Sequence, residues 1–215
     1  LDKVMAGYQP QTVAVIINAS NSSPAGSVTF SGTAIQVEIL TAVTSTILDE
    51  DGLGDFSYQW FAGDVAIANA TESTLTLSQA EVDKAITVKV SYTDGYGASE
   101  ELTSSASAAV VNVNDAPTIS TTASLTTAED TATAAIAFSG IDADGDTLNF
   151  SFSDPAKGSV VNNNDGTFTY TPDANENGAD SFTLTVNDGT VDVSQTIDVA
   201  IIEKTYTVTV GSAVT

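Results

Sequence analysis

Acidic residues placed at alternate positions around a glycine are the side chains of this sequence best suited to chemistry. Asp142, Asp144 and Asp146 are spaced in this way around Gly145. Two carboxylates about 4 Å apart repel each other by roughly 4 kcal/mol at an effective dielectric constant of 20. A close group of carboxylates therefore needs a cation or a proton. Oxygen ligands in a flexible arrangement suit Ca²⁺ better than Mg²⁺, which keeps more of its own water.

Further acids and amides extend this pattern. Asp49 and Asp51 stand at the same spacing before Gly52 in the first half of the chain. The remaining candidate ligands are Asn112, Asn114 and Asp115 in a connecting segment, Glu129 shortly beyond it, and Asp188 before a glycine. The sequence predicts Ca²⁺ as the bound ion. Asp-x-Asp-Gly is also an ordinary turn sequence, and this alternative stays open for both groups of aspartates.

Composition excludes several other functions. The 215 residues include 28 Asp and Glu, 5 Lys and Arg, and neither His nor Cys, for a net charge of −23. No Ser-His-Asp triad, cysteine nucleophile, disulfide or zinc site with His or Cys ligands can form. The charge opposes binding to nucleic acid and to anionic membranes. No run of 18 apolar residues exists, so we expect no membrane insertion. The opening residues do not form a signal peptide, and we interpret the chain as a piece of a longer protein.

Alternating apolar residues indicate β-strands almost throughout. The cleanest runs are Ile86, Val88, Val90 and Tyr92 in the first half, and Phe182, Leu184 and Val186 in the second. Shorter alternations include Val13 to Ile17, Val28 and Phe30, Val37 and Ile39, and Phe56 to Trp60. Ser78 to Glu81 matches a capping box and predicts a single helical turn. Asn164-Asp165-Gly166 predicts a hairpin.

The segment from Val111 to Pro117 marks a boundary, because Pro117 cannot continue a strand ladder. We expect residues 1–20 to be the tail of a preceding module, residues 21–114 and 115–202 to be two β-sandwich domains, and residues 203–215 to start a following module. The predicted fold class is all-β, with two tandem Ig-like or cadherin-like sandwiches arranged end to end.

Several motifs carry a resemblance to known repeats. Residues 21–114 resemble the Ig-like repeats of giant RTX-type bacterial surface adhesins, through Asp49 to Trp60, Asn69 to Leu77 and Ala85 to Gly95. Residues 115–202 resemble the cadherin-like repeats of the same proteins. The matching stretches are Asn114 to Pro117, Ala128 to Asp130, Asp142 to Asp146, Asp165 to Pro172, Asp180 to Phe182 and Asn187 to Gly189.

The resemblance implies that Asn112, Asn114 and Asp115 bind calcium in the linker. It also implies that Asp142 and Asp144 reach back to that junction with Asp188 nearby, and that Glu129 faces the following junction. The sequence departs from the family pattern at two places. Asn18-Ala19-Ser20-Asn21 lacks the expected acid, and Lys204 follows Glu203 where an acid would be expected.

The resemblance further implies a calcium-stiffened extender of an adhesin exported by type I secretion and held at the bacterial surface. Its partners would be neighbouring repeats, and we expect a monomer without catalytic activity. Two alternatives from other classes remain: one module binds a carbohydrate or another surface, or the pair accompanies a polysaccharide-degrading enzyme. Tyr96 is the exposed aromatic candidate for a ligand, while Trp60 and Tyr58 are more typical of a core than of a sugar platform. Paired carboxylates could also hydrolyse glycosides, but acids in solvated turns do not suit that chemistry.

Overall fold

The computed structural model describes residues 20–206. It divides between Asn112 and Val113 into two compact units, here called unit 1 (residues 20–112) and unit 2 (residues 113–206). The expected domain boundary lies two residues further along. The expected tail of a preceding module, residues 1–20, falls almost wholly outside the described residues, as does most of the expected start of a following module, residues 203–215.

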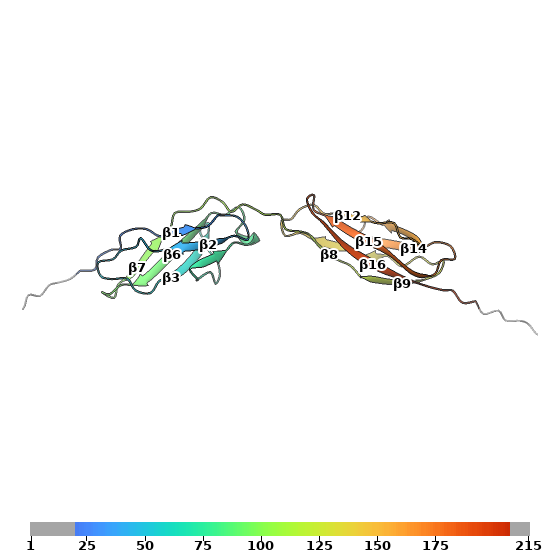
Figure 1. Cartoon of the computed structure of the whole chain (residues 1–215), viewed down its shortest axis with the longest axis horizontal. Coiled ribbons are helices and arrows are strands. Elements are labelled where there is room, and N and C mark those ends of the chain that lie inside the picture. The colour runs from blue at the N-terminus through green and yellow to red at the C-terminus, as the bar shows by residue number, and fades with distance from the viewer. Residues whose placement is uncertain (1–19, 207–215) are drawn as a thin grey trace, which may run out of the picture. The chain divides into compact units, whose positions relative to one another are not determined.

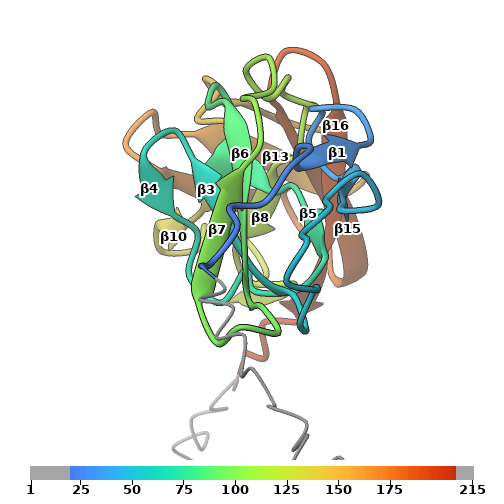
Figure 2. The ribbon, with the colours of Figure 1, turned by 90° about the vertical axis from the view of Figure 1, so that its left-hand side faces the viewer.

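Unit 1 is a sandwich of two sheets that enclose one core (Figures 1 and 2). Its elements are β1 (Thr29–Ser31), β2 (Ile39–Val43), β3 (Ser57–Ala62), β4 (Val65–Ala66), β5 (Thr74–Thr76), η1 (Gln79–Glu81), β6 (Ile86–Thr93) and β7 (Ser99–Thr103). One sheet has the order β1-β2-β5 and the other β4-β3-β6-β7. All pairings between these strands are antiparallel.

Unit 2 is also built from β-sheets. Its strands are β8 (Thr118–Ser120), β9 (Ser124–Ala128), β10 (Ile136–Ala137), β11 (Ser139–Ile141), β12 (Asn149–Phe152), β13 (Gly158–Asn162), β14 (Thr167–Pro172), β15 (Gly178–Asn187) and β16 (Asp192–Ile202). They form sheets of order β10-β14-β13, β11-β8 and β12-β15-β16-β9. The pairing of β16 with β9 is parallel, whereas β16 and β15 form a long antiparallel hairpin.

Each unit has its own hydrophobic core. Trp60 lies at the centre of the core of unit 1, fully buried, and its indole nitrogen donates a 2.9 Å hydrogen bond to the carbonyl of Glu72. This position excludes Trp60 from a sugar platform. The core of unit 2 is rich in aromatic rings, among them Phe168, Tyr170 and Phe182. The all-β fold and the Ig-like or cadherin-like sandwich class predicted from the alternation are therefore confirmed.

Local sequence signals are confirmed at several elements. Alternate residues of β6 and of β15 are buried, as their apolar spacing predicts. Ser78 caps η1 in a complete capping box with Glu81. The hairpin predicted at Asn164 connects β13 to β14. Among the described residues, no helix has the length and apolar character needed to span a membrane.

The predicted alternation of Val37 and Ile39 is wrong in register. Their side chains are 65% and 54% exposed, whereas Leu40 between the sheets is fully buried. Val37 has a φ of 65°, a left-handed conformation that costs energy for a β-branched residue. Because of the turn at Val37, β2 buries the side chain of Leu40 instead of those of Val37 and Ile39. A shift of one residue in a strand moves every side chain to the opposite face.

Candidate metal centres

The first candidate centre lies in unit 2, in the loop between β11 and β12. Asp142, Asp144 and Asp146 each place a carboxylate oxygen within 4.8 Å of the other two. The loop is held by Oδ1 of Asp142, which accepts hydrogen bonds of 2.9 Å from the amide of Asp144 and 3.1 Å from that of Asp146. Gly145 allows the sharp turn through a φ of 78°. The loop therefore bends so that the three carboxylates lie close together, with that of Asp146 exposed.

Two oxygens of this loop are buried without a partner among the described residues, Oδ2 of Asp142 and Oδ1 of Asp144. At 4.8 Å, two carboxylate charges repel by about 3 kcal/mol at an effective dielectric constant of 20. Buried carboxylate oxygens without a hydrogen-bond donor add a desolvation cost. A divalent cation would relieve both penalties, and a set made only of oxygens suits Ca²⁺.

The connecting segment is tied to this loop. The backbone amide of Asp115 donates a 2.7 Å hydrogen bond to Oδ2 of Asp144. The side-chain amide of Asn114 donates a 2.9 Å hydrogen bond to Oδ2 of Asp188. The structure therefore brings together four of the residues predicted around this centre: Asn114, Asp115, Asp144 and Asp188.

Asp188 is buried in the turn between β15 and β16, with only 7% of its surface exposed. The hydrogen bond from Asn114 and those from the amides of Val191 and Thr190 stabilise its ionised form and hold the pKa of its carboxyl below the usual value. Asp188 therefore stays charged at neutral pH and adds negative charge beside the linker.

Two of the predicted ligands lie elsewhere. Glu129 follows β9, and its carboxylate accepts a 3.1 Å hydrogen bond from the amide of Lys204. Because β9 and β16 run parallel, Glu129 sits at the end of β16 opposite to Asp188. Asn112 is exposed and is the last residue of unit 1. The roles of both as metal ligands stay predictions.

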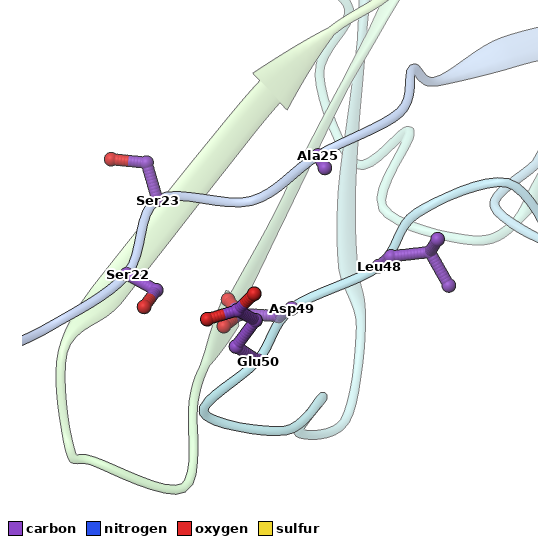
Figure 3. Close-up of a pocket in the computed structure, with 6 residues that line it drawn as sticks. All are labelled: Ser22, Ser23, Ala25, Leu48, Asp49 and Glu50. Carbon is purple, nitrogen blue, oxygen red and sulfur yellow. The ribbon is translucent and has the colours of Figure 1, made fainter.

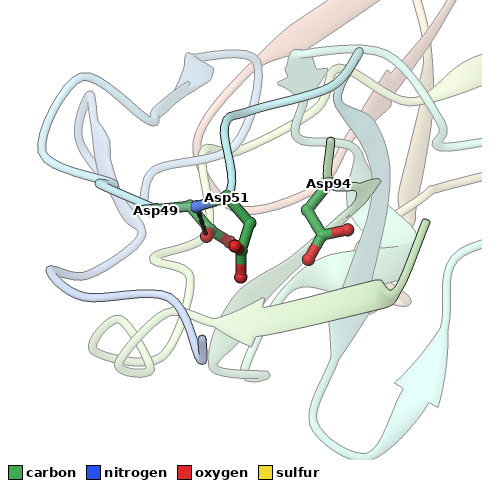
Figure 4. Close-up of side chains that lie close together, drawn as sticks. All are labelled: Asp49, Asp51 and Asp94. Carbon is green, nitrogen blue, oxygen red and sulfur yellow. Dashed lines mark hydrogen bonds between the residues drawn. The ribbon is translucent and has the colours of Figure 1, made fainter. Parts of the chain in front are cut away.

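The second candidate centre lies in unit 1 and includes a residue that the sequence analysis missed. Asp49 and Asp51 come from the loop before β3, and Asp94 from the turn after β6, with carboxylate oxygens within 4.8 Å of one another. Figure 4 shows the three side chains next to each other. Gly95 makes this approach possible: its amide donates a 3.0 Å hydrogen bond to the carbonyl of Asp51, and a Cβ at this position would meet that oxygen at 2.3 Å.

Several carboxylate oxygens of the centre in unit 1 already accept hydrogen bonds from the protein. Oδ1 of Asp49 accepts a 2.9 Å bond from the amide of Asp51, and its Oδ2 accepts a 2.7 Å bond from the hydroxyl of Tyr92. Oδ2 of Asp51 accepts a hydrogen bond of 2.5 Å from the amide of Ser22. Burial and the bond to Asp49 raise the pKa of Tyr92 far above its usual value, so this hydroxyl stays a donor at any physiological pH.

Asp94 could have been found from a repeated signal. It directly follows the strand with the cleanest alternation in the first half and precedes a glycine, as Asp188 does in the second half. The amide of Tyr96 donates to Oδ1 of Asp94, and the amide of Thr190 donates to Oδ1 of Asp188. In both units, an aspartate that follows a strand and precedes a glycine therefore accepts the amide two residues further along.

An open cleft adjoins the centre of unit 1. Its volume is about 600 Å³, and it is lined by Ser22, Ser23, Ala25, Leu48, Asp49 and Glu50. Figure 3 shows the side chains of Asp49 and Glu50 next to Ser22, with Leu48 further along the same wall. The side chain of Leu48 is 67% exposed. The cleft therefore joins an acidic end to an apolar one.

Comparison with known proteins gives one family match, which lies within unit 2. Residues 113–202 match the family model of the cadherin-like domain. This match covers the loop of Asp142 to Asp146 together with Asn114, Asp115 and Asp188. A comparison with curated proteins gives no match.

The solved structures that match this chain have low sequence identity to it and low TM-scores. An endo-fucoidan hydrolase of glycoside hydrolase family 107 has 16% identity and a TM-score of 0.34, over 74% of this chain and 25% of that one. Three N-terminal domains of the bacteriophage RB49 outer capsid protein Hoc have 18% identity and a TM-score of 0.32, over 81% and 59%. Extracellular domains 3–5 of Drosophila OTK have 13% identity and a TM-score of 0.36, over 83% and 62%. This chain thus spans a quarter of the length of the hydrolase and about three fifths of the length of the other two.

Proposed function

We propose that this chain is an extender segment of a large bacterial cell-surface adhesin, stiffened by calcium at the start of unit 2. Tandem β-sandwich units and the cadherin-like match of unit 2 are consistent with an extender or adhesion module. In this proposal the parent protein is secreted by a type I system, is anchored at the outer membrane, and carries its ligand-binding domains elsewhere. The segment itself contacts neighbouring repeats and stays monomeric.

One observation carries the proposal: the two buried, unpartnered oxygens of Asp142 and Asp144. They belong to a loop that already holds the linker through the bond from the amide of Asp115 to Asp144. A cation bound by this loop would therefore also fix the residues that lead into unit 2. An ion that binds only the folded state stabilises that state, so folding would be completed in an environment rich in calcium.

The acidic composition supports the same role. A net charge of −23 keeps unfolded or newly exported chains apart and soluble. The absence of cysteine from the sequence prevents crosslinking during export. We infer that the segment is not itself an enzyme, because its acidic groups lie in turns at strand ends and the sequence has no histidine or cysteine.

Small-angle scattering and thermal melting in calcium and in EDTA would test the proposal. We expect calcium to raise the melting temperature of unit 2 and to narrow the distribution of particle dimensions. The double variant Asp142→Asn with Asp144→Asn should lose both effects. Asp198→Asn is the matched control, because Asp198 is exposed on β16 and lies in neither acidic group. Identical melting and scattering with calcium and with EDTA would exclude calcium stiffening.

A second candidate function is ligand binding by unit 1, and the cleft of Figure 3 favours it. Its volume falls in the range of small-molecule sites. A glycan array would test this function with Leu48→Asn and Tyr96→Ala as variants, since Tyr96 is 52% exposed. Val65→Ala is a suitable control because Val65 is exposed and does not line the cleft. Binding that both test variants retain would exclude the cleft and Tyr96 as the site.

A further inference from the structure

The two acidic groups occupy the same place in the topology of their units. In unit 1, Asp49 and Asp51 precede β3, which pairs with β6, and Asp94 follows β6. In unit 2 the loop 142–146 precedes β12, which pairs with β15, and Asp188 follows β15. In each unit, these aspartates therefore lie at the end of a strand pair where one strand begins and its antiparallel partner ends.

The hydrogen bonds within the two groups also correspond. The second aspartate donates its amide to Oδ1 of the first in both units, at 2.9 Å for Asp51 and Asp49 and at 2.9 Å for Asp144 and Asp142. The second aspartate then accepts, at Oδ2, an amide from the segment that leads into the unit. The donor is Asp115 in unit 2 and Ser22 in unit 1. Ser22 thus stands in unit 1 where Asp115 stands in unit 2.

Asp94 supplies a second, independent sign of a ligand in unit 1. It is 6% exposed, and its Oδ2 is buried without a hydrogen-bond partner among the described residues. Its Oδ1 is already held by the amides of Tyr96 and Ala98, at 2.9 Å and 2.7 Å. These bonds fix the carboxylate of Asp94, which lies next to those of the other two aspartates (Figure 4), with one oxygen of each residue within 4.8 Å of the others. A buried anionic oxygen in such a position is costly unless a cation binds it.

We propose that unit 1 has its own calcium site, formed by Asp49, Asp51 and Asp94, and that this site is weaker than the one in unit 2. The inference shares with the proposed function the premise that calcium is the ion. It adds Asp94 to the ligands Asp49 and Asp51 that the sequence predicts, in a unit whose leading residues, Asn18 to Asn21, lack the acid of the family pattern.

The difference in affinity follows from the number of buried ligand oxygens that are free to bind an ion. Each group has three carboxylates. In unit 1, Oδ2 of Asp94 is the one buried oxygen of the group without a hydrogen-bond partner among the described residues, and one oxygen of Asp49 is shared with the hydroxyl of Tyr92. In unit 2, Oδ2 of Asp142 and Oδ1 of Asp144 are both buried without such a partner. Because more of its ligand oxygens are free to bind the ion, the site in unit 2 should fill first as calcium rises. Filling of the site in unit 1 would then fix the segment at Ser22.

A calcium titration of the whole chain, followed by calorimetry and by two-dimensional amide NMR, would test this inference. We expect the amides of Asp115 and Asp144 to shift first, and those of Ser22, Tyr96 and Ala98 to shift at higher calcium. Asp94→Asn should weaken the second event at least about tenfold and leave the first unchanged. Asp64→Asn, in an exposed turn of the same unit, should behave like the wild type.

If Asp94→Asn impairs folding, a variant that should bind calcium more tightly provides a second test. Ser22→Asp adds a carboxylate at the residue whose amide donates to Oδ2 of Asp51, and it should strengthen calcium binding in unit 1 about tenfold.

The outcomes separate the two proposals. A response confined to unit 2 up to about 10 mM calcium, which is well above the dissociation constants of extracellular modules, would overturn the inference and leave the proposed function intact. No response in either unit would overturn both. Filling of unit 1 at or below the calcium concentration that fills unit 2 would overturn the proposed order.

Discussion

The cores of the two units are built from different side chains. Unit 1 packs aliphatic residues around Trp60, whereas unit 2 packs a group of phenylalanines, with Phe138, Phe152 and Phe168 in mutual ring contact. Yet both units place aspartates in the loop before one strand and in the turn after the strand that pairs with it. The difference teaches that the acidic groups do not depend on a particular core. They depend on the pairing of two antiparallel strands, which both units share.

Replacing a large core side chain with alanine should have the largest effect on stability, and the effect should be confined to one unit. We expect Trp60→Ala to destabilise unit 1, and Phe168→Ala to destabilise unit 2, each by about 3–5 kcal/mol. Differential scanning calorimetry should show one transition lowered and the other in place for each variant, because each unit has a core of its own. Transitions that move together in both variants would contradict this independence.

Removal of calcium should affect the units unequally. Where the free ion is 100-fold above its dissociation constant, its removal costs about 2.7 kcal/mol of stability. As calcium is lowered stepwise, we expect unit 1 to lose its stabilisation first and unit 2 to lose it at lower calcium, as measured by thermal melting. Equal losses in both units at every concentration would remove the proposed difference between the sites.

Each unit also has a buried tyrosine whose hydroxyl donates a 2.7 Å hydrogen bond to an aspartate. The pairs are Tyr92 with Asp49 in unit 1 and Tyr170 with Asp180 in unit 2. A hydrogen bond to a charged acceptor contributes about 1.5–3 kcal/mol. Asp180 lies outside the acidic group of unit 2, so the cost of Tyr170→Phe should not depend on calcium. The cost of Tyr92→Phe should change with calcium, because Asp49 is a proposed ligand. Chemical denaturation of both variants with and without calcium would measure this contrast.

The bond in unit 2 has a defined pH dependence. Burial acts to raise the pKa of Asp180, but hydrogen bonds from Tyr170 and from the amides of Ser181, Lys157 and Ala156 outweigh it, so the pKa is lower than its usual value of 3.8. A lowered pKa means that this carboxylate stabilises the fold above about pH 4 and that the contribution is lost as the pH falls further. The stability difference between wild type and Tyr170→Phe should therefore shrink in acid. A difference that stays constant down to pH 2 would contradict this assignment.

Surface ion pairs should have the smallest effect. In unit 1, Nζ of Lys89 lies 3.1 Å from Oε1 of Glu101, and in unit 2, Nζ of Lys157 lies 3.9 Å from Oε2 of Glu176. All four side chains are more than a third exposed. Solvent screens such pairs, so Glu101→Gln and Glu176→Gln should each cost less than about 1 kcal/mol. The small effect should vanish in 1 M salt, as followed by thermal melting. A larger or salt-resistant loss in one unit would mark that pair as structurally important.

The sequence predicts the fold through local patterns and fails where distant residues decide. Alternation identified β6 and β15 because both strands are paired and have one buried face. It failed at Val37, where a left-handed residue shifts the register and no local signal reveals it. Spacing was enough to group Asp142 with Asp144, which lie in one loop. Asp94 escaped because it meets Asp51 only through the pairing of β3 with β6, across 43 positions of sequence.

The parallel pairing of β9 with β16 has a mechanical consequence. Five residue pairs, from Asp198 with Ser124 to Ile202 with Ala128, connect these strands side by side. Tension that pulls β9 toward its amino end and β16 toward its carboxyl end would slide the two strands along each other, so that their hydrogen bonds share the load instead of breaking one after another. Shear of this kind resists force better than peeling does, and it would let unit 2 carry tension along the chain before it yields.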